Sequence, residues 1–190
     1  MSDLFSQSNL LVSGTSIARK AEEEQFLRFH QAPDHQVMLP VRQITEVLKI
    51  DVGQIVPIPQ MPAWVMGVYN WRGDILWMVD LGHLIGFNSW YQREINTSNY
   101  TAIVLAPNKK NQDQKNQNQG SENPSLGLII SRVEDIEWCD TEAIQSPPAS
   151  AVTSSLVPFL RGYWLKQSSE MILVLDGQAI VAAMPKALTN

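Results

Sequence analysis

Three histidines and one cysteine are the strongest candidates in this chain for binding a metal ion or attacking a substrate. His30, His35 and His83 do not have metal-ligand spacing with one another or with Cys139. Cys139 is followed by Asp140, and nothing around it in the sequence indicates a lowered thiol pKa. A glycine-rich phosphate loop is also absent from the sequence. We therefore predict no catalytic cluster, no metal and no cofactor, and an enzyme built around Cys139 stays open as a remote alternative.

Arg72 has the chemistry and the position of a residue that binds another protein. It lies between two β-rich runs, Trp64–Tyr69 and Ile75–Val79, and a short loop that contains glycine between such runs is typical of a hairpin. A hairpin turn projects away from the core, and the guanidinium offers five donors in a rigid fork, so arginine is frequent at interface hot spots. The alternative is a solvated arginine, or one that holds a neighbouring loop through backbone carbonyls.

The neighbours of Arg72 are expected to shape this turn, Asn70–Asp74. Gly73 allows a positive φ, and the Asn70 side chain can bond to the turn backbone. Gly67, in the preceding run, indicates a bulge or a close backbone approach. Trp71 is either an exposed anchor for a partner's pocket or a ring folded back over its own barrel. Most of the six tryptophans should be core.

The rest of the chain consists mainly of short apolar runs separated by turn residues, which predicts nine or ten short strands. Asp80 and Asp176 each follow such a run, and we expect them to cap a short helical turn and a C-terminal helix from Gly177 to Leu188. A turn is predicted at Arg161-Gly162. The run at 43–48 fits a strand or one helical turn, and the other runs are 25–31, 36–41, 54–58, 100–105, 126–131, 133–138, 156–160, 163–165 and 171–175.

Two segments carry too few apolar residues to pack. Residues 1–24 are polar and serine-rich for most of their length, and we predict a mobile N-terminal tail. Residues 107–124 are almost wholly Asn, Gln, Lys and Ser, so burial cannot offset their ordering entropy and a disordered loop is expected.

Composition excludes several classes of protein. The 190 residues are 44% hydrophobic and 17% charged, which is typical of a globular protein, and the net charge of −5 disfavours a nucleic-acid partner. One cysteine permits no intrachain disulfide. A secretory signal and a run of 18 apolar residues are both missing from the sequence, so we expect a cytoplasmic protein with no direct membrane insertion.

The segment Trp64–Gly86 resembles the signature stretch of CheW coupling proteins of chemotaxis-type arrays. That stretch is an apolar strand, then Gly-Val-x-Asn-Leu-Arg-Gly, then an apolar strand that closes in Asp-Leu. The matching residues are Gly67, Val68, Asn70, Arg72, Gly73, Asp80 and Leu81, with Trp71 in place of the usual leucine. Flanking matches follow in the family's order at 26–29, 39–41, Ile44, Glu46, Val47, the prolines 57, 59 and 62, 127–130, 160–162 and 171–176.

This resemblance implies a mainly β fold. Two small five-stranded SH3-like barrels would pack together, with short helices and a C-terminal helix. A CheW-like domain would span 25–188, as two interlocked barrels at about 37–98 and 99–165 with the first and last segments shared.

The resemblance also implies a non-enzymatic adaptor that couples chemoreceptors to a CheA-type histidine kinase. Its partners would be the kinase's regulatory domain and the cytoplasmic tip of methyl-accepting chemoreceptors, so the protein would be recruited to membrane-associated receptor arrays. The implied interaction residues are Arg72, Trp71, Asn70, Gly73, Val41, Ile44, Glu46, Val47 and Gly127. Val41, Ile44, Glu46 and Val47 would line a groove between the barrels, and the alternative is that the three aliphatic residues are ordinary core and Glu46 a solvated charge. A CheW-like module for pilus motility or phototaxis remains an alternative to the chemotaxis function.

Overall fold

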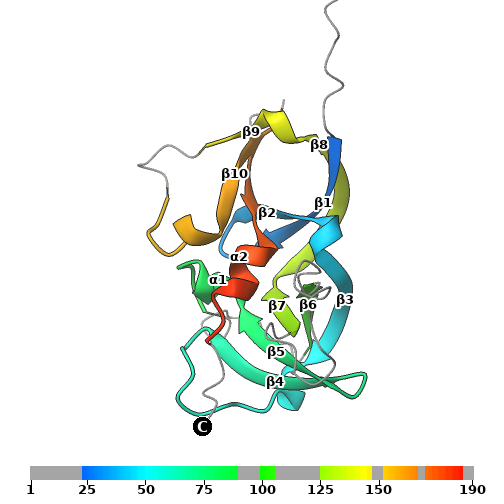
Figure 1. Ribbon diagram of the computed structural model, residues 1–190, viewed down its shortest axis with the longest axis vertical. Coiled ribbons are helices and arrows are strands. Elements are labelled where there is room, and N and C mark those ends of the chain that lie inside the picture. The colour runs from blue at the N-terminus through cyan, green and yellow to red at the C-terminus, as the bar shows by residue number, and fades with distance from the viewer. Residues whose placement is uncertain (1–22, 90–98, 106–124, 147–151, 167–169, 186–190) are drawn as a thin grey trace, which may run out of the picture.

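The computed structural model describes residues 23–89, 99–105, 125–146, 152–166 and 170–185 (Figure 1). The predicted disordered loop at 107–124, nearly all of the predicted tail and Trp90 lie outside the described residues.

The described chain forms two β-sheets, one above the other in Figure 1. The six-stranded sheet has the order β8 (Arg132–Asp140), β1 (Glu23–Gln31), β2 (His35–Pro40), β11 (Met171–Leu175), β10 (Leu160–Leu165) and β9 (Ile144–Gln145). The five-stranded sheet has the order β3 (Ile44–Asp51), β6 (Asn99–Leu105), β7 (Ser125–Ile130), β5 (Asp74–Asp80) and β4 (Val65–Trp71).

Both sheets repeat one plan. Each contains an antiparallel pair, β1–β2 or β6–β7, that joins the next strand in parallel, β11 or β5. Each also contains an antiparallel hairpin, β4–β5 or β10–β11, and a short helix follows it: α1 (Leu81–Leu84) after β5 and α2 (Gly177–Ala182) after β11. Asp80 and Asp176 cap these helices as predicted, since each side chain accepts a backbone N–H in the first turn. α2 ends at Ala182, earlier than expected.

The two halves exchange strand pairs. The β1–β2 pair precedes β3 in the chain but pairs with β8 and β11, whereas β6–β7 pairs with β3 and β5. The linker η1 (Val41–Gln43) carries the chain from one sheet to the other. The predicted division at 98/99 therefore does not follow the strand pairing, because residues 99–105 and 125–130 belong with 44–80.

The core has three layers because each sheet is apolar on both faces. The middle layer lies between the sheets and includes Leu27 and Ile103. The other face of the six-stranded sheet encloses a small core with Phe26 and Cys139, and that of the five-stranded sheet a core with Met78. Strands buried on both faces read as continuous apolar runs rather than alternating ones, as β7 and β11 do.

The predicted mainly β, SH3-like fold class is confirmed, although each sheet is an open barrel with two edge strands rather than a closed one. Further corrections concern the second half of the chain. The first sheet has six strands rather than five. The run at 156–160 is mainly the 3-10 turn η6 (Val157–Phe159), where Pro158 suits the first turn of a helix. The predicted turn at Arg161-Gly162 is wrong, because both residues lie in β10 at a bulge. A Cβ on Gly162 would lie 2.6 Å from the Gln145 carbonyl oxygen, so this glycine permits a close approach of β9 instead.

The prediction for the tryptophans is also wrong. Trp64, Trp71, Trp77 and Trp164 are half-buried at the margins of the cores, and Trp138 is 60% exposed. Aliphatic side chains, together with Phe26 and Phe29, fill most of the centres.

Candidate functional site

The hairpin between β4 and β5 displays Arg72 at a two-residue turn. Arg72 has φ +57° and Gly73 φ +92°, so both central residues are left-handed, as a type I′ hairpin turn requires. The Asn70 side-chain oxygen accepts the Gly73 backbone N–H at 3.1 Å. The strands continue to Trp71 and Asp74, so the turn is shorter than the predicted Asn70–Asp74 loop. The roles expected of Gly73 and Asn70 in shaping the turn are confirmed.

The Arg72 guanidinium is exposed but held in place. Its Nη2 donates to Glu46 Oε2 at 2.7 Å, and the side chains are 68% and 27% exposed. Its Cζ also lies 5.3 Å from the centre of the Trp71 ring, within the range of a cation–π contact. Glu46 lies on β3 and Arg72 at the end of β4, and these are the two edge strands of the five-stranded sheet. The ion pair therefore joins the open edges of this barrel and orients the fork toward solvent.

Trp71 folds back over its own barrel. Its ring packs against the core that contains Met78, and its Nε1 is buried without a hydrogen-bond partner in the described part of the chain. Trp71 thus serves as the platform beneath Arg72.

The aliphatic residues of the predicted groove form a separate group at the margin of the layer between the sheets. Val41 and Ile44 are half-buried against that layer. Val47 is 42% exposed and lies opposite Ile103 on the face of β3 that borders the same layer. Glu46 points to the other face, because a bulge at Thr45 changes the register. The structure therefore brings Glu46 to Arg72, and not to the three aliphatic residues.

Two further residues of this margin are not predicted from the sequence. Ile136 and Trp138, on the edge strand β8, are 51% and 60% exposed. Ile136 lies opposite Leu27, and Trp138 is two residues further along, so both are on the face that borders the middle layer. The apolar-polar alternation Ile136-Glu137-Trp138 is the only sequence signal, and it does not say which face is exposed.

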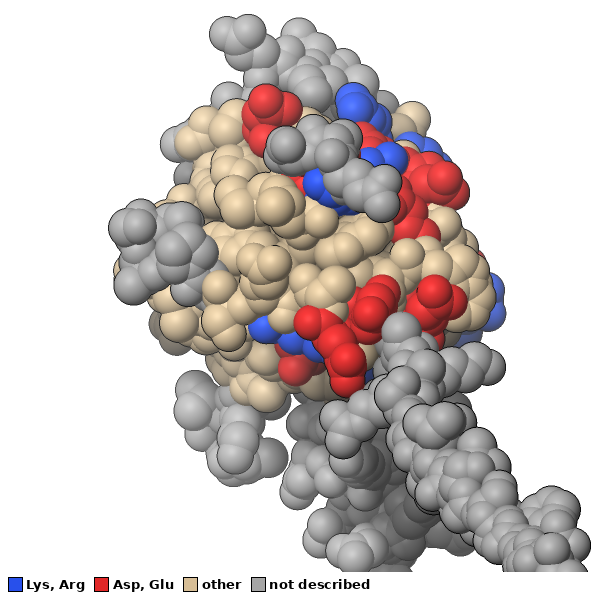
Figure 2. Space-filling model, turned by 90° about the horizontal axis from the view of Figure 1, so that it is seen from above, with Lys and Arg blue, Asp and Glu red and all other residues tan. Residues whose placement is uncertain are grey.

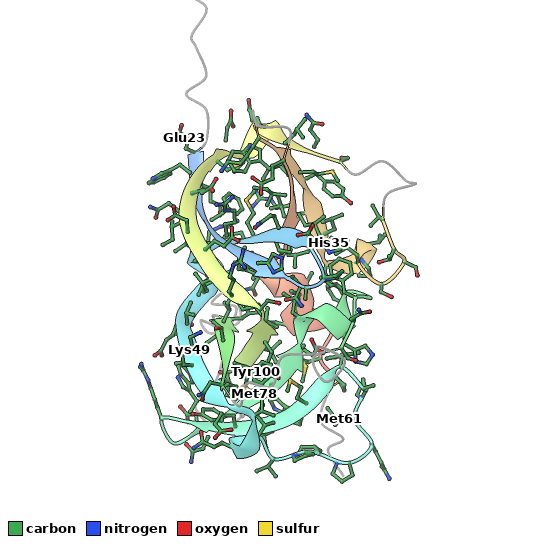
Figure 3. The ribbon with its side chains drawn as sticks, turned by 180° about the vertical axis from the view of Figure 1, so that it is seen from behind. Glu23, His35, Lys49, Met61, Met78 and Tyr100 are labelled. Carbon is green, nitrogen blue, oxygen red and sulfur yellow. The ribbon has the colours of Figure 1, made fainter. Side chains whose placement is uncertain are left out.

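Gly127 is buried in β7 and faces the inside of the five-stranded barrel. A Cβ at this position would lie 2.8 Å from Met78 Sδ. Figure 3 shows Met78 in the lower barrel of the molecule, away from its rim. Any influence of Gly127 on a partner would therefore act through the packing of the barrel.

The residues with catalytic potential do not converge. His30 lies 3.7 Å from Asp34 in the β1–β2 hairpin, and His35 stacks on Phe87 with ring centres 3.9 Å apart. Cys139 is buried in the core of the six-stranded barrel. Within the described ranges, no three His, Cys, Asp or Glu side chains are placed to hold a metal ion.

Cys139 should resist alkylation in the folded protein. Burial is the main cause that raises the pKa of its thiol to about 11, and the Asp140 charge adds to it. Because the thiolate is the reactive form, we expect iodoacetamide at about pH 8 to modify the native protein at least about tenfold more slowly than the urea-unfolded protein. Mass spectrometry over time measures both rates. Equal rates would show that the thiol is accessible.

His35 should make the fold less stable in mild acid. Burial lowers its pKa, with His30 adding to this effect and the Asp34 carboxylate opposing it. The unfolded chain therefore binds more protons than the folded one below about pH 6.5. The stability that depends on a neutral His35 is fully present above that pH. It is lost as the pH drops toward the lowered pKa of His35, and the stability then stays constant at still lower pH. His35→Phe keeps the stack on Phe87 and should reduce the difference in urea midpoint between about pH 7.5 and about pH 5.5. An unchanged difference would contradict this assignment.

The face of the molecule that is seen from above carries charges of both signs. Seen from above, the Lys, Arg, Asp and Glu side chains gather toward one side with both signs mixed, and a broad uncharged surface covers much of that face (Figure 2). No helix among the described residues has both the length and the apolar character needed to cross a membrane.

Comparisons with known proteins agree with this geometry. The family model "CheW-like domain" matches residues 25–184. The chain is 25% identical over 141 residues to "Chemotaxis protein CheW" of Treponema pallidum (strain Nichols), covering 73% of this chain and 71% of that protein. The crystal structure of the scaffolding protein TtCheW from Thermoanaerobacter tengcongensis has the same fold, with a TM-score of 0.58, 23% identity, and coverage of 80% of this chain and 88% of that one. Because the family model spans most of the sequence, the chain belongs to the CheW-like domain family.

Proposed function

We propose that this protein couples chemoreceptors to a CheA-type histidine kinase. It would bind the regulatory domain of the kinase and the cytoplasmic tip of a methyl-accepting receptor, and act by contact rather than by catalysis. This function would place it in the cytoplasm, at membrane-associated receptor arrays.

The observation that carries the proposal is the Arg72 turn. An arginine that is two-thirds exposed, held by Glu46 and supported by Trp71, has lost part of its conformational freedom before a partner arrives. A preorganised fork binds carboxylates or backbone carbonyls at a lower entropic cost than a free side chain.

The apolar margin supplies a second contact region of different chemistry. Val47, Ile136 and Trp138 expose apolar surface on strands β3 and β8, which belong to different sheets. Exposed apolar surface of this kind suits the apolar side of an amphipathic helix. Two regions on one molecule can engage two proteins at once, and modest individual contacts then gain strength through multivalent assembly.

The test uses the purified full chain, a CheA-type kinase and a soluble receptor fragment that contains the cytoplasmic tip. We expect the chain to bind each partner separately in titration calorimetry and to join kinase and receptor in one complex in size-exclusion chromatography. Binding to neither partner would refute the proposal. Binding to only one would refute the coupling function.

A further inference from the structure

The linker between the two sheets is fastened to the C-terminal helix by one side chain, Gln43. Its Nε2 donates to Asp176 Oδ1 at 3.0 Å, and its Oε1 accepts the Gly177 backbone N–H at 2.7 Å. Asp176 and Gly177 lie 133 and 134 residues further along the chain. The side-chain amide therefore uses both its donor and its acceptor to join η1 to the start of α2.

The start of α2 is shaped to receive this amide. The same Asp176 oxygen accepts the Gln178 backbone N–H at 2.9 Å and so caps the helix. Gly177 is buried, and a Cβ on it would lie 2.9 Å from Gln43 Oε1 and 3.2 Å from Leu105 Cδ2. The missing side chain thus makes room for Gln43 at this point.

Two residues of the apolar margin lie on either side of Gln43 in the sequence. Val41 begins η1 and Ile44 begins β3, and both pack on the layer between the sheets. Ile44 lies opposite Leu105, the residue closest to Gly177 after Gln43. A chain of contacts therefore connects α2, through Gln43 and Leu105, to the apolar margin at Ile44.

A second polar contact of η1, the ion pair of Arg42, is weaker than the hydrogen bonds of Gln43. Arg42 pairs with Glu24, which also pairs with Arg161 at 2.9 Å. The Arg42 side chain is 66% exposed, and ion pairs this exposed contribute little. The hydrogen bonds of Gln43 are partly buried, so they constrain the linker more strongly.

We propose that Gln43 is a positioning residue for partner docking: its amide fixes the linker against α2 and thereby sets where Val41 and Ile44 lie. This inference rests on the proposed function, since the surface that Gln43 positions is the apolar margin assigned to a partner's amphipathic helix.

Two variants break the clamp from opposite sides. Gln43→Leu removes both hydrogen bonds, whereas Gly177→Ala leaves Gln43 intact and displaces its amide from the α2 side. We expect each to weaken binding of the receptor fragment about tenfold, which corresponds to the loss of about one or two buried hydrogen bonds. We also expect faster amide hydrogen exchange at residues 41–44, a readout that needs no partner.

A charge pair separates positioning from general destabilisation. Gln43→Glu keeps an acceptor for Gly177 but places a second carboxylate against Asp176, so it should weaken binding. Adding Asp176→Asn removes the charge repulsion, but its amide cannot donate to the new carboxylate and cap Gln178 with the same atom, so it should restore only part of the lost binding. The matched control is Ile172→Val in the core of the six-stranded barrel, which lowers stability without touching η1.

The outcomes are distinct. If the original chain binds the receptor fragment and the Gln43 and Gly177 variants bind no more weakly than Ile172→Val, the positioning role is refuted and the proposed function stands. If the original chain does not bind, the proposed function fails, and exchange at 41–44 still decides whether Gln43 orders the linker. Unchanged exchange in both clamp variants would overturn the inference.

Discussion

Arg72→Glu should abolish most partner recruitment while leaving the fold intact. The substitution reverses the charge of the displayed fork, removes the contact with the Trp71 ring and places a carboxylate beside Glu46. Loss of a central arginine costs about 2 kcal/mol or more at an interface hot spot, so we expect at least about 30-fold weaker binding. The side chain is 68% exposed, so the lost ion pair should lower the free energy of unfolding by less than about 1 kcal/mol. Calorimetric titration and thermal melts measure the two effects.

The matched control for this experiment is Arg132→Glu. Arg132 is 66% exposed and pairs with Glu134 at 3.1 Å, so its exposure and its ion pair resemble those of Arg72, but it lies on β8 rather than at a hairpin tip. Equal losses of affinity for both variants would indicate a general charge effect. Arg72→Lys adds a finer test, because it keeps the charge but loses the planar fork and should give an intermediate affinity.

Gly67→Ala should destabilise the protein more than any other glycine-to-alanine change in the five-stranded sheet. Gly67 has φ +141°, and a Cβ there would lie 2.2 Å from the Val56 carbonyl oxygen. That oxygen accepts the Val68 backbone N–H at 2.9 Å, so the backbone cannot retreat without breaking a bridge to β4. We expect a loss of about 3 kcal/mol or more, which lowers the Tm of a domain of this size by about 6–12 °C.

Gly73→Ala is the matched control for Gly67→Ala. Gly73 also has a positive φ, +92°, but no atom lies within 4 Å of the Cβ position. Only backbone strain remains, which costs about 1–2 kcal/mol. A similar fall in Tm for the two variants would show that the contact with Val56 contributes nothing.

The sequence predicts the central hairpin well because local physics determines it. Asn70, Gly73 and the flanking runs indicate the hairpin and the positive φ of Gly73 within a few positions, whereas the left-handed φ of Arg72 is not predicted. Gly67 likewise marks a bulge and a close backbone approach, as expected. The capping roles of Asp80 and Asp176 depend only on neighbouring residues, and they too are confirmed.

The features that the sequence does not predict depend on distant partners. The exchange of β1–β2 and β6–β7 between sheets leaves no local signature, so the division at 98/99 misses it. The partner of Arg72 is Glu46, 26 residues earlier, and the sequence argument considers only backbone carbonyls for such a contact. Gly162 resembles a turn glycine, but its role is to admit β9. Exposure of Trp138 follows from the edge position of β8, which only the sheet order reveals.

The exchange of strand pairs also determines when the protein can fold. β1 leaves the ribosome early, but its partner β8 comes about a hundred residues later, and the clamp from η1 to α2 closes across 134 residues. The five-stranded sheet uses only the consecutive strands β3 to β7, so it can form before the rest of the chain is made. The six-stranded sheet joins β1 and β2 to β8–β11, so synthesis must be nearly finished before it is complete. Distant pairings of this kind slow folding, and we expect β1 and β2 to remain sensitive to protease in nascent chains stalled before β11.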